Sequence, residues 1–274
     1  IGVDAAPDVL MIDQAYSNES LADKLIDLLD DASQVVYSFS RAGTGELVQQ
    51  SLSMLRRLAR QGKICPTQLA DLDPLVNAMR LLKSKAEVAQ MAAACAISVT
   101  AHKRAMNVCK VGMHEYQLAA ELHHQFTTQG SQRLAYGSIV AGGENACILH
   151  YTNNDQVLQD GDLVLIDAGC ELDHYASDIT RTFPVNGRFS EAQKTIYELV
   201  LAAHEAALAC IKPGAVYTDM QDAAVKVITQ GLIGIGLLTG ELEQNIEQQT
   251  FRKFYMHNIG HWLGMDVHDV GVYK

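Results

Sequence analysis

The segment that decides the fold of this chain runs Leu163-Val-Leu-Ile-Asp167-Ala-Gly-Cys-Glu-Leu-Asp-His-Tyr-Ala-Ser-Asp178-Ile-Thr-Arg-Thr-Phe183. Two runs rich in apolar and β-branched residues flank a polar stretch, and this pattern predicts a β-hairpin. With the turn centred between Leu172 and Asp173, Asp167 lies directly opposite Asp178, on the same face of the sheet. The sequence therefore predicts two carboxylates side by side on adjacent antiparallel strands.

Two like charges in this position destabilise the pairing of the strands, so something must neutralise them. A pair of divalent metal ions bridged by the carboxylates would do so. The alternative is that one of the two aspartates faces solvent or caps a turn. We favour the metal site because Asp167 directly follows an apolar run that predicts a buried strand, and buried carboxylates are almost never left unpaired.

A second candidate site lies between Met256 and Gly271, where three histidines fall within twelve residues around the single tryptophan of the chain. His257 and His261 have the spacing of a zinc-protease helix, but asparagine stands where that motif needs glutamate. Neighbouring glycines also argue against a helix, so we predict loop and strand here. A lone histidine is usually structural, whereas His257, His261 and His268 together more often form a site.

Other motifs carry weaker signals. His150 ends an apolar run and, taken alone, is more often a structural residue than a functional one. The glycines at 231–236 do not form the dinucleotide-binding fingerprint, and there is neither a phosphate-binding loop nor a GxSxG nucleophile elbow.

The composition excludes several classes of protein. The 274 residues include 21 Lys and Arg against 32 Asp and Glu, which gives a formal net charge of −11. This balance argues against binding to nucleic acids, whose affinity depends on basic side chains, and against an anionic membrane surface. No apolar run approaches the roughly 20 residues that span a bilayer. With 48% hydrophobic residues the chain is that of a packed globular protein rather than a disordered one.

The cysteines and the N-terminus bear on the compartment. The six cysteines are scattered without a CxxC pair, and we interpret them as reduced thiols. Asp4 and Asp8 stand where a signal peptide would have basic residues, and the chain does not begin with Met, so Ile1 is interpreted as an internal start. These features favour a cytoplasmic protein.

Hydrophobic periodicity divides the chain at a loop that contains Pro66 and Pro74. Residues 1–80 predict a small α/β domain, and residues 81–274 predict a second domain of longer helices and β segments. Capping boxes at Ser84 and Ser190 mark the starts of two of these helices. The predicted helices are 21–29, 46–62, 84–110, 115–128, 190–211 and 218–232, and the predicted strands are 34–40, 136–140, 147–151, 163–168 and 175–183.

Four motifs, in this order, resemble aminopeptidase P, the Xaa-Pro aminopeptidase branch of the pita-bread metallopeptidases. They are Gly142-Gly-Glu-Asn with Ile148-Leu-His-Tyr-Thr, then Leu165-Ile-Asp-Ala-Gly169, Ser177-Asp-Ile-Thr-Arg-Thr-Phe-Pro-Val-Asn-Gly187 and His261-Trp-Leu-Gly-Met-Asp-Val-His-Asp-Val-Gly271. The resemblance covers nearly the whole chain. It implies an α/β (α+β) fold, in which 1–80 is the C-terminal part of a creatinase-like N-terminal domain. Residues 81–274 would then be a pita-bread catalytic domain, truncated at its C-terminus, with a curved, mainly antiparallel sheet flanked by helices.

The resemblance also implies a cofactor and a ligand set. Members of this family hold two divalent metal ions, typically Mn²⁺, and the matching ligands here are Asp167, Asp178 and His261. His150, His257 and His268 match unliganded histidines that position the substrate and move protons. The two glutamate ligands of the family follow the last motif, beyond Lys274, so the resemblance implies that the chain is a fragment and inactive as it stands.

The expected function is hydrolysis of the bond between an N-terminal residue and a following proline in peptide substrates, by a water that bridges the two metal ions. The main alternative is a prolidase, which cleaves only Xaa-Pro dipeptides. A catalytically silent pita-bread binding module is a further alternative, which the three matching metal ligands argue against. A homo-oligomer is possible on this fold.

Overall fold

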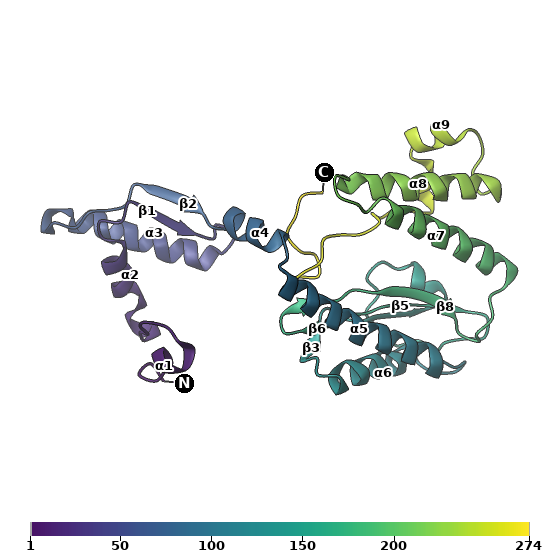
Figure 1. The fold of residues 1–274 in the computed structure, drawn as a ribbon, viewed down its shortest axis with the longest axis horizontal. Helices are drawn as coiled ribbons and strands as arrows, with labels where there is room; N and C mark the ends of the chain where they lie inside the picture. Colours follow the sequence, from purple (N-terminus) through teal and green to yellow (C-terminus); the bar gives the residue numbers. More distant parts are fainter. Residues whose placement is uncertain (1, 274) are drawn as a thin grey trace. The chain divides into compact units, whose positions relative to one another are not determined.

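The computed structural model describes residues 2–273, which form two compact units. The N-terminal unit ends at Leu82, and the C-terminal unit begins at Lys83 (Figure 1). Each unit has an apolar core of its own.

The N-terminal unit contains a two-stranded parallel sheet and short helices. Its elements are α1 (Ala6–Leu10), α2 (Leu21–Leu29), β1 (Gln34–Tyr37), α3 (Ala42–Arg57), β2 (Gln68–Asp71) and α4 (Asp73–Leu81). Its core joins α2, β1 and α3 through Leu29, Val35, Val48, Leu52 and Leu55. The predicted helix over 46–62 was misplaced, because α3 begins at Ala42 and a 3₁₀ turn follows Arg57. Neither β2 nor α4 was predicted, since both are short and largely exposed.

The C-terminal unit combines antiparallel strands with long helices, which confirms the predicted fold class. Its elements are α5 (Lys85–Val108), α6 (Glu115–Thr128), β3 (Arg133–Leu134), β4 (Ile139–Gly142), β5 (Leu163–Asp167), β6 (Cys170–Leu172), β7 (Tyr175–Ala176), β8 (Thr180–Pro184), α7 (Glu191–Ala209), α8 (Tyr217–Gly234) and α9 (Leu242–Glu247). The strands form two three-stranded sheets, ordered β3-β6-β7 and β4-β5-β8. Capping boxes start α5 at Ser84 and α7 at Ser190, as predicted.

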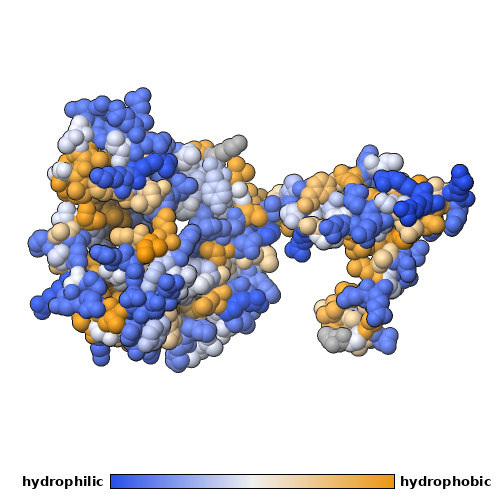
Figure 2. Space-filling view, turned by 180° about the vertical axis from the view of Figure 1, so that it is seen from behind, coloured by the Kyte–Doolittle hydropathy of each residue, from blue (hydrophilic) through white to orange (hydrophobic). Residues whose placement is uncertain are grey.

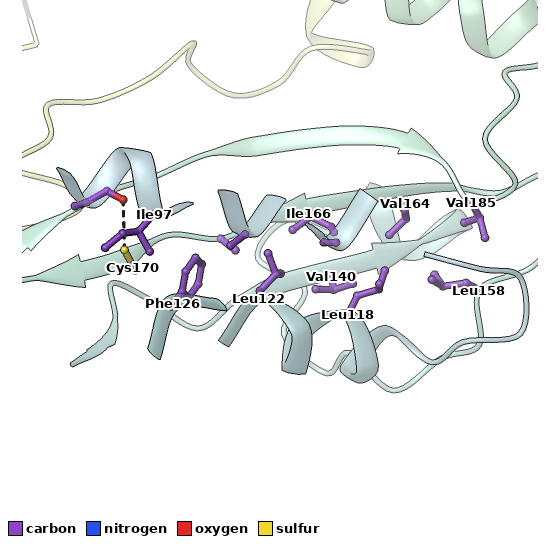
Figure 3. Packing of buried hydrophobic residues seen from close by; sticks show 14 residues of the cluster. Ile97, Leu118, Leu122, Phe126, Val140, Leu158, Val164, Ile166, Cys170 and Val185 are labelled. Atoms are coloured by element: carbon purple, nitrogen blue, oxygen red, sulfur yellow. Dashed lines mark hydrogen bonds between the residues drawn. The ribbon is translucent and has the colours of Figure 1, made fainter. Parts of the chain in front are cut away.

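The main core lies between helices α5 and α6 and one face of the strands (Figure 3). Helix α5 contributes small residues, including Ala94 and Ala101, which are fully buried and let the helix approach the strands closely. Figure 3 shows Leu118, Leu122 and Phe126 of α6 packed towards Ile166 and its neighbours. Because the side chains of Val164 and Ile166 point into this core, the side chain of Asp167 projects from the opposite face of β5.

The hairpin turn differs from the predicted one by one residue. Asp173 and His174 both have positive φ, 46° and 71°, as a two-residue type I′ hairpin turn requires. Leu172 therefore pairs with Tyr175, and the same register places Asp167 opposite Thr180. The prediction that Asp167 lies directly opposite Asp178 was wrong.

The two aspartates nevertheless share a face of the sheet. Asp178 stands two residues before Thr180, the partner of Asp167, and residues two apart on a strand point the same way. The backbone continues in the same register here, because Ala168 N donates to Ile179 O at 3.1 Å. Moving the turn by one residue shifts the pairing of the strands by two residues. This shift changed the partner of Asp167 but left its side chain on the same face of the sheet.

Residues 147–151 do not form the predicted strand. A 3₁₀ helix covers Gly143–Cys147, and irregular backbone follows. The fully buried carboxylate of Glu115 accepts hydrogen bonds from Gly142 N at 2.7 Å and from the Tyr151 hydroxyl at 2.8 Å. Gln156 N and the side chain of Asn145 also donate to it. These bonds to one side chain replace the ladder that a strand would need.

Helices α7 and α8 pack as an antiparallel pair, followed by α9 and an irregular C-terminal segment (Figure 1). Small side chains, Ala203, Ala207 and Ala224, form the contact. Gly231 leaves room for Leu199 of α7, whose side chain would have to move if a Cβ were added 2.2 Å away. Beyond η4 (Thr250–Lys253) the backbone is irregular up to residue 273, which confirms the loop predicted for the histidine-rich stretch and shows that the strand predicted with it was wrong.

Apolar side chains reach the surface of both units in separate patches (Figure 2). They include Val200 and Ile211 on and beyond α7, and Met79 on α4. Among residues 2–273 no helix combines the length and the apolar character that crossing a bilayer requires.

Candidate metal centre

The carboxylates of Asp167 and Asp178 meet at the hydroxyl of Tyr136. This hydroxyl donates to Asp167 Oδ1 in a short hydrogen bond, and it lies 2.9 Å from Asp178 Oδ1. Asp167 ends β5, whereas Asp178 lies in the extended stretch between β7 and β8. The predicted convergence of the two carboxylates is therefore confirmed, although they are diagonal rather than opposite neighbours.

A close backbone approach brings the two aspartates together. A Cβ on Gly169 would lie 1.7 Å from Ser177 O and 3.1 Å from Asp178 N, so only glycine fits here. On the core side, the Ser177 hydroxyl lies 2.7 Å from that of Ser98 in α5 and donates to Cys170 O at 2.8 Å. These buried bonds hold the backbone just before Asp178 against α5.

A buried histidine supports the other aspartate. His102 Nε2 donates to Ala168 O at 3.0 Å, one residue beyond Asp167. Burial lowers the pKa of His102, which favours the neutral ring, and this hydrogen bond only partly opposes the effect. The Nδ1 atom of His102 is buried and has no hydrogen-bond partner among the described residues. His102 is thus a neutral donor that fixes the end of β5.

The electrostatics of the centre favour a cation. Burial raises the pKa of Asp167, and the nearby charge of Asp178 raises it further, while the hydrogen bond from Tyr136 acts in the opposite direction. Burial and the charges of the two aspartates raise the pKa of Tyr136 above its ordinary value, so its hydroxyl remains a donor. A positive charge placed between these groups would remove the cost of ionising Asp167.

His261 completes a group of three potential ligands. Its Nε2 lies 3.0 Å from Asp178 Oδ2, and its Nδ1 lies 2.9 Å from the carbonyl oxygen of Trp262. The carbonyl at Nδ1 orients the ring as in metal-binding histidines, so Nε2 faces the carboxylate of Asp178 and could bind a cation in place of the hydrogen that it donates there. His261 and Asp178 are both partly buried, with side chains 24% and 21% exposed.

The other three predicted histidines lie at different distances from this group. His268 packs against His261, with ring centroids 4.1 Å apart. His257 is exposed and packs edge-on against Tyr255 rather than against the carboxylates. His150 is exposed and has a φ of 56°, in the loop that follows the 3₁₀ helix η3 (Gly143–Cys147). The structure thus brings one of the three, His268, into contact with the predicted ligands.

The donor set suits a divalent cation, since carboxylate oxygens and an imidazole nitrogen are the ligands that Mn²⁺ and Zn²⁺ accept. Asp167, Asp178 and His261 are joined by hydrogen bonds rather than gathered around one point. Within residues 2–273 no three His, Cys, Asp or Glu side chains are arranged to hold an ion. The chemistry of the residues therefore fits a metal, and the hydroxyl of Tyr136 occupies the position between the two carboxylates.

Sequence reasoning missed Tyr136 and Gly169 as parts of this centre. Tyr136 was assigned only to the start of a strand, and no local pattern links it to aspartates 31 and 42 residues away. Gly169 did appear in the Leu-Ile-Asp-Ala-Gly motif. A glycine two residues beyond an aspartate at a strand end was the available signal for a close backbone approach.

The family follows from the match of the metallopeptidase family M24 model to residues 89–274. The chain belongs to metallopeptidase family M24. This M24 chain is 43% identical over 274 residues to the Xaa-Pro aminopeptidase of Escherichia coli (strain K12), a match that covers 100% of the chain and 62% of that protein.

Two solved structures extend the likeness to the fold. Pseudomonas aeruginosa aminopeptidase PepP matches the M24 chain with a TM-score of 0.97 and 48% identity, over 100% of the chain and 62% of that protein. A zinc-substituted Escherichia coli aminopeptidase P in complex with product matches with a TM-score of 0.96 and 44% identity, again over 100% and 62%. The chain thus spans less than two thirds of the length of these relatives.

These matches confirm the predicted family and the pita-bread fold. The chain thus belongs to a family of metallopeptidases, and one of its solved relatives is zinc-substituted.

Proposed function

We propose that the protein carrying this chain is an Xaa-Pro aminopeptidase, a two-metal hydrolase that releases the first residue from peptides with proline in the second position. One observation carries the proposal. In a chain of family M24, Asp178 meets both Asp167, through Tyr136, and the Nε2 atom of His261. A silent binding module would have no use for two converging carboxylates that lie beside an oriented imidazole.

In this proposal Asp167, Asp178 and His261 hold the metal, and we propose Mn²⁺ because carboxylate oxygens predominate among the ligands. A bound pair of such ions would lower the pKa of a water molecule to near neutrality and polarise the scissile carbonyl. Tyr136 then has the task of orienting the two carboxylates, because its hydroxyl contacts an oxygen of each.

The remaining histidines handle the substrate and its protons. Xaa-Pro is a tertiary amide without an N–H, so a peptidase cannot hold it by that donor. The proline nitrogen must receive a proton as it leaves, and a histidine near the ligands suits this role. His268 is the candidate supported by contact, since its ring packs on His261. We propose His150 and His257 as residues that line the substrate side.

The net charge of the chain supports a cationic peptide substrate, and its free cysteines support the proposed cellular location. A net charge of −11 suits a peptide with a cationic α-amino group and disfavours nucleic acids and anionic membranes as partners. All six cysteines are free thiols, which supports our proposal of a reducing, cytoplasmic location. A homo-oligomer is a further possibility that a sedimentation measurement would test.

The proposal is tested on the whole protein that carries this chain, in the presence of Mn²⁺, with three substrates. They are an Xaa-Pro dipeptide, an Xaa-Pro tetrapeptide and the same tetrapeptide with alanine in place of proline. We expect release of the first residue from the proline tetrapeptide and little from the alanine one. Cleavage of the dipeptide alone would identify a prolidase instead. No cleavage of any substrate by protein shown to contain metal would support the silent binding module and contradict the proposal.

A further inference from the structure

The residues from 256 to 271, here called the histidine segment, have no helix or strand, yet they carry His261 to Asp178. Few backbone bonds shape the segment. Asp269 N donates to Trp262 O at 3.0 Å and so closes a loop, and Gly264 N donates to Asp266 O at 3.1 Å. A segment with so few bonds needs other contacts to hold an imidazole in one place.

One such contact is a buried ion pair. Lys83 Nζ lies 2.7 Å from Asp269 Oδ2, and the two side chains are only 13% and 1% exposed. The partners are 186 residues apart in the sequence. Lys83 directly precedes Ser84, whose capping box fixes the start of α5, so the ammonium group projects from a well-held backbone.

The ion pair connects to the strand next to Asp178. A Cβ on Gly264 would lie 2.1 Å from Asp269 Oδ2, so the carboxylate rests directly on the Gly264 backbone. The carbonyl of Gly264 accepts from Ala176 N in β7 at 2.9 Å, two residues before Asp178. Lys83, Asp269 and Gly264 therefore form a chain of contacts that ends beside the carboxylate facing His261.

We propose that Lys83 is a positioning residue, whose ion pair with Asp269 holds the histidine segment so that His261 faces Asp178. This inference rests on the proposed function in assigning a metal to His261. Replacing Lys83 with an uncharged residue takes one cation from a carboxylate that is 1% exposed, and weakening the pairing of a buried charge favours local rearrangement. Helix α5 is fixed by its own hydrogen bonds, and Gln221 and Tyr217 of α8 bond to Ile259 N and Gly260 O. The part of the segment that rearranges is therefore the loop from His261 to Asp269.

The chain contains its own reporter for this role. Trp262 is the single tryptophan and lies within the histidine segment, where its indole N–H donates to Val272 O at 3.2 Å. Its ring is 37% exposed and packs on Tyr217 of α8. Tryptophan emission and its quenching by acrylamide therefore measure the order of the segment without any need for activity.

The experiment compares Lys83→Met, Asp269→Asn and the double variant with the wild-type protein in the presence of a chelator. Lys85→Met is the matched control, because Lys85 is exposed two residues further on. Each single variant should shift Trp262 emission to longer wavelength and raise acrylamide quenching about twofold. The double variant should show no larger effect than Asp269→Asn alone, because Lys83 then has no carboxylate left to pair with. Lys83→Arg, which keeps the charge, should restore wild-type values.

A Mn²⁺ titration supplies the second measurement. Lys83→Met and Asp269→Asn should weaken Mn²⁺ binding by about 10- to 100-fold, as loss of a supporting contact does at metal sites. Wild-type emission, quenching and affinity in both variants would overturn the proposal, as would additive effects in the double variant. Loss of cooperative unfolding in both would overturn it in favour of a general stabilising role. If wild-type protein binds Mn²⁺ but cleaves no Xaa-Pro peptide, the proposed function fails while the fluorescence comparison still decides the role of Lys83.

Discussion

Asp167 and Asp178 share one hydrogen-bond donor, the hydroxyl of Tyr136. A hydroxyl has one hydrogen, so it cannot donate fully to two ionised carboxylates at the same time. Burial of Asp167 makes the shortage costly, and the charge of Asp178 adds to the cost. A bound proton or a metal cation would therefore stabilise the pair.

Tyr136→Phe should destabilise the metal-free protein. The substitution keeps the ring and removes the donor that the two carboxylates share, and loss of a hydrogen bond to a partly buried charged acceptor costs about 1–3 kcal/mol. Urea unfolding in the presence of a chelator measures the free energy of unfolding. Tyr116→Phe is the control, because Tyr116 is 52% exposed and should be neutral. Equal stability of the two variants would contradict the shared-donor arrangement.

Asp167→Asn should change how the stability of the metal-free protein depends on pH. The pKa of Asp167 is raised above its ordinary 3.8, chiefly by burial, so the native state binds this proton more tightly than the unfolded state. The associated stability is present below pH 3.8 and is lost as the pH rises through the raised pKa. The Asn variant should lack this loss and be the more stable protein at neutral pH.

Unfolding curves at several pH values, with chelator and with Mn²⁺, test this prediction. Added Mn²⁺ should reverse the order, because it stabilises only a protein that retains the carboxylate. Asp23→Asn, at an exposed position of α2, is the control. A wild-type protein that gains stability relative to Asp167→Asn as the pH rises without metal would show that the sign is wrong.

His261→Ala and His257→Ala should separate metal binding from turnover. His261 contacts Asp178, whereas His257 packs on Tyr255, so His261→Ala should lose metal, as measured by calorimetry with Mn²⁺ and by elemental analysis. His257→Ala should keep the metal and lose turnover by about 100- to 10,000-fold, the range of general acid–base contributions. The reverse pattern would exchange the two assignments.

Glu115→Gln should destabilise the C-terminal unit. The carboxylate of Glu115 is fully buried and accepts bonds from two backbone N–H groups and from the hydroxyl of Tyr151. In the Gln variant the NH₂ group would replace one carboxylate oxygen and face a hydrogen-bond donor. The lost bond should lower the free energy of unfolding by about 1.5–3 kcal/mol. Glu121→Gln on the same helix removes an exposed pair with Arg104 and should cost under about 1 kcal/mol. Similar losses in both variants, measured by denaturant unfolding, would contradict the role of Glu115.

Local signals explain which elements could be predicted. The capping boxes at Ser84 and Ser190 are complete within four residues, and both helices begin where the boxes place them. The apolar run over 147–151 was assigned to a strand because nothing nearby identifies Glu115, more than 30 residues earlier, as the partner of Tyr151. The hairpin was found, but its turn was placed one residue early, because both Asp173 and His174 had to be recognised as left-handed.

The family, the long helices and the chemical identity of the donors could be predicted from the sequence, because they depend on residue types at short spacing. The pairing of Asp167 with Thr180, the place of Tyr136 between the two aspartates and the contact of Lys83 with Asp269 emerged from the folded chain alone. Register depends on the φ angles of two turn residues, and the other contacts join residues 31 to 186 positions apart. Such contacts arise when helices and strands pack, and packing depends on the shape of the whole unit rather than on any stretch of neighbouring residues.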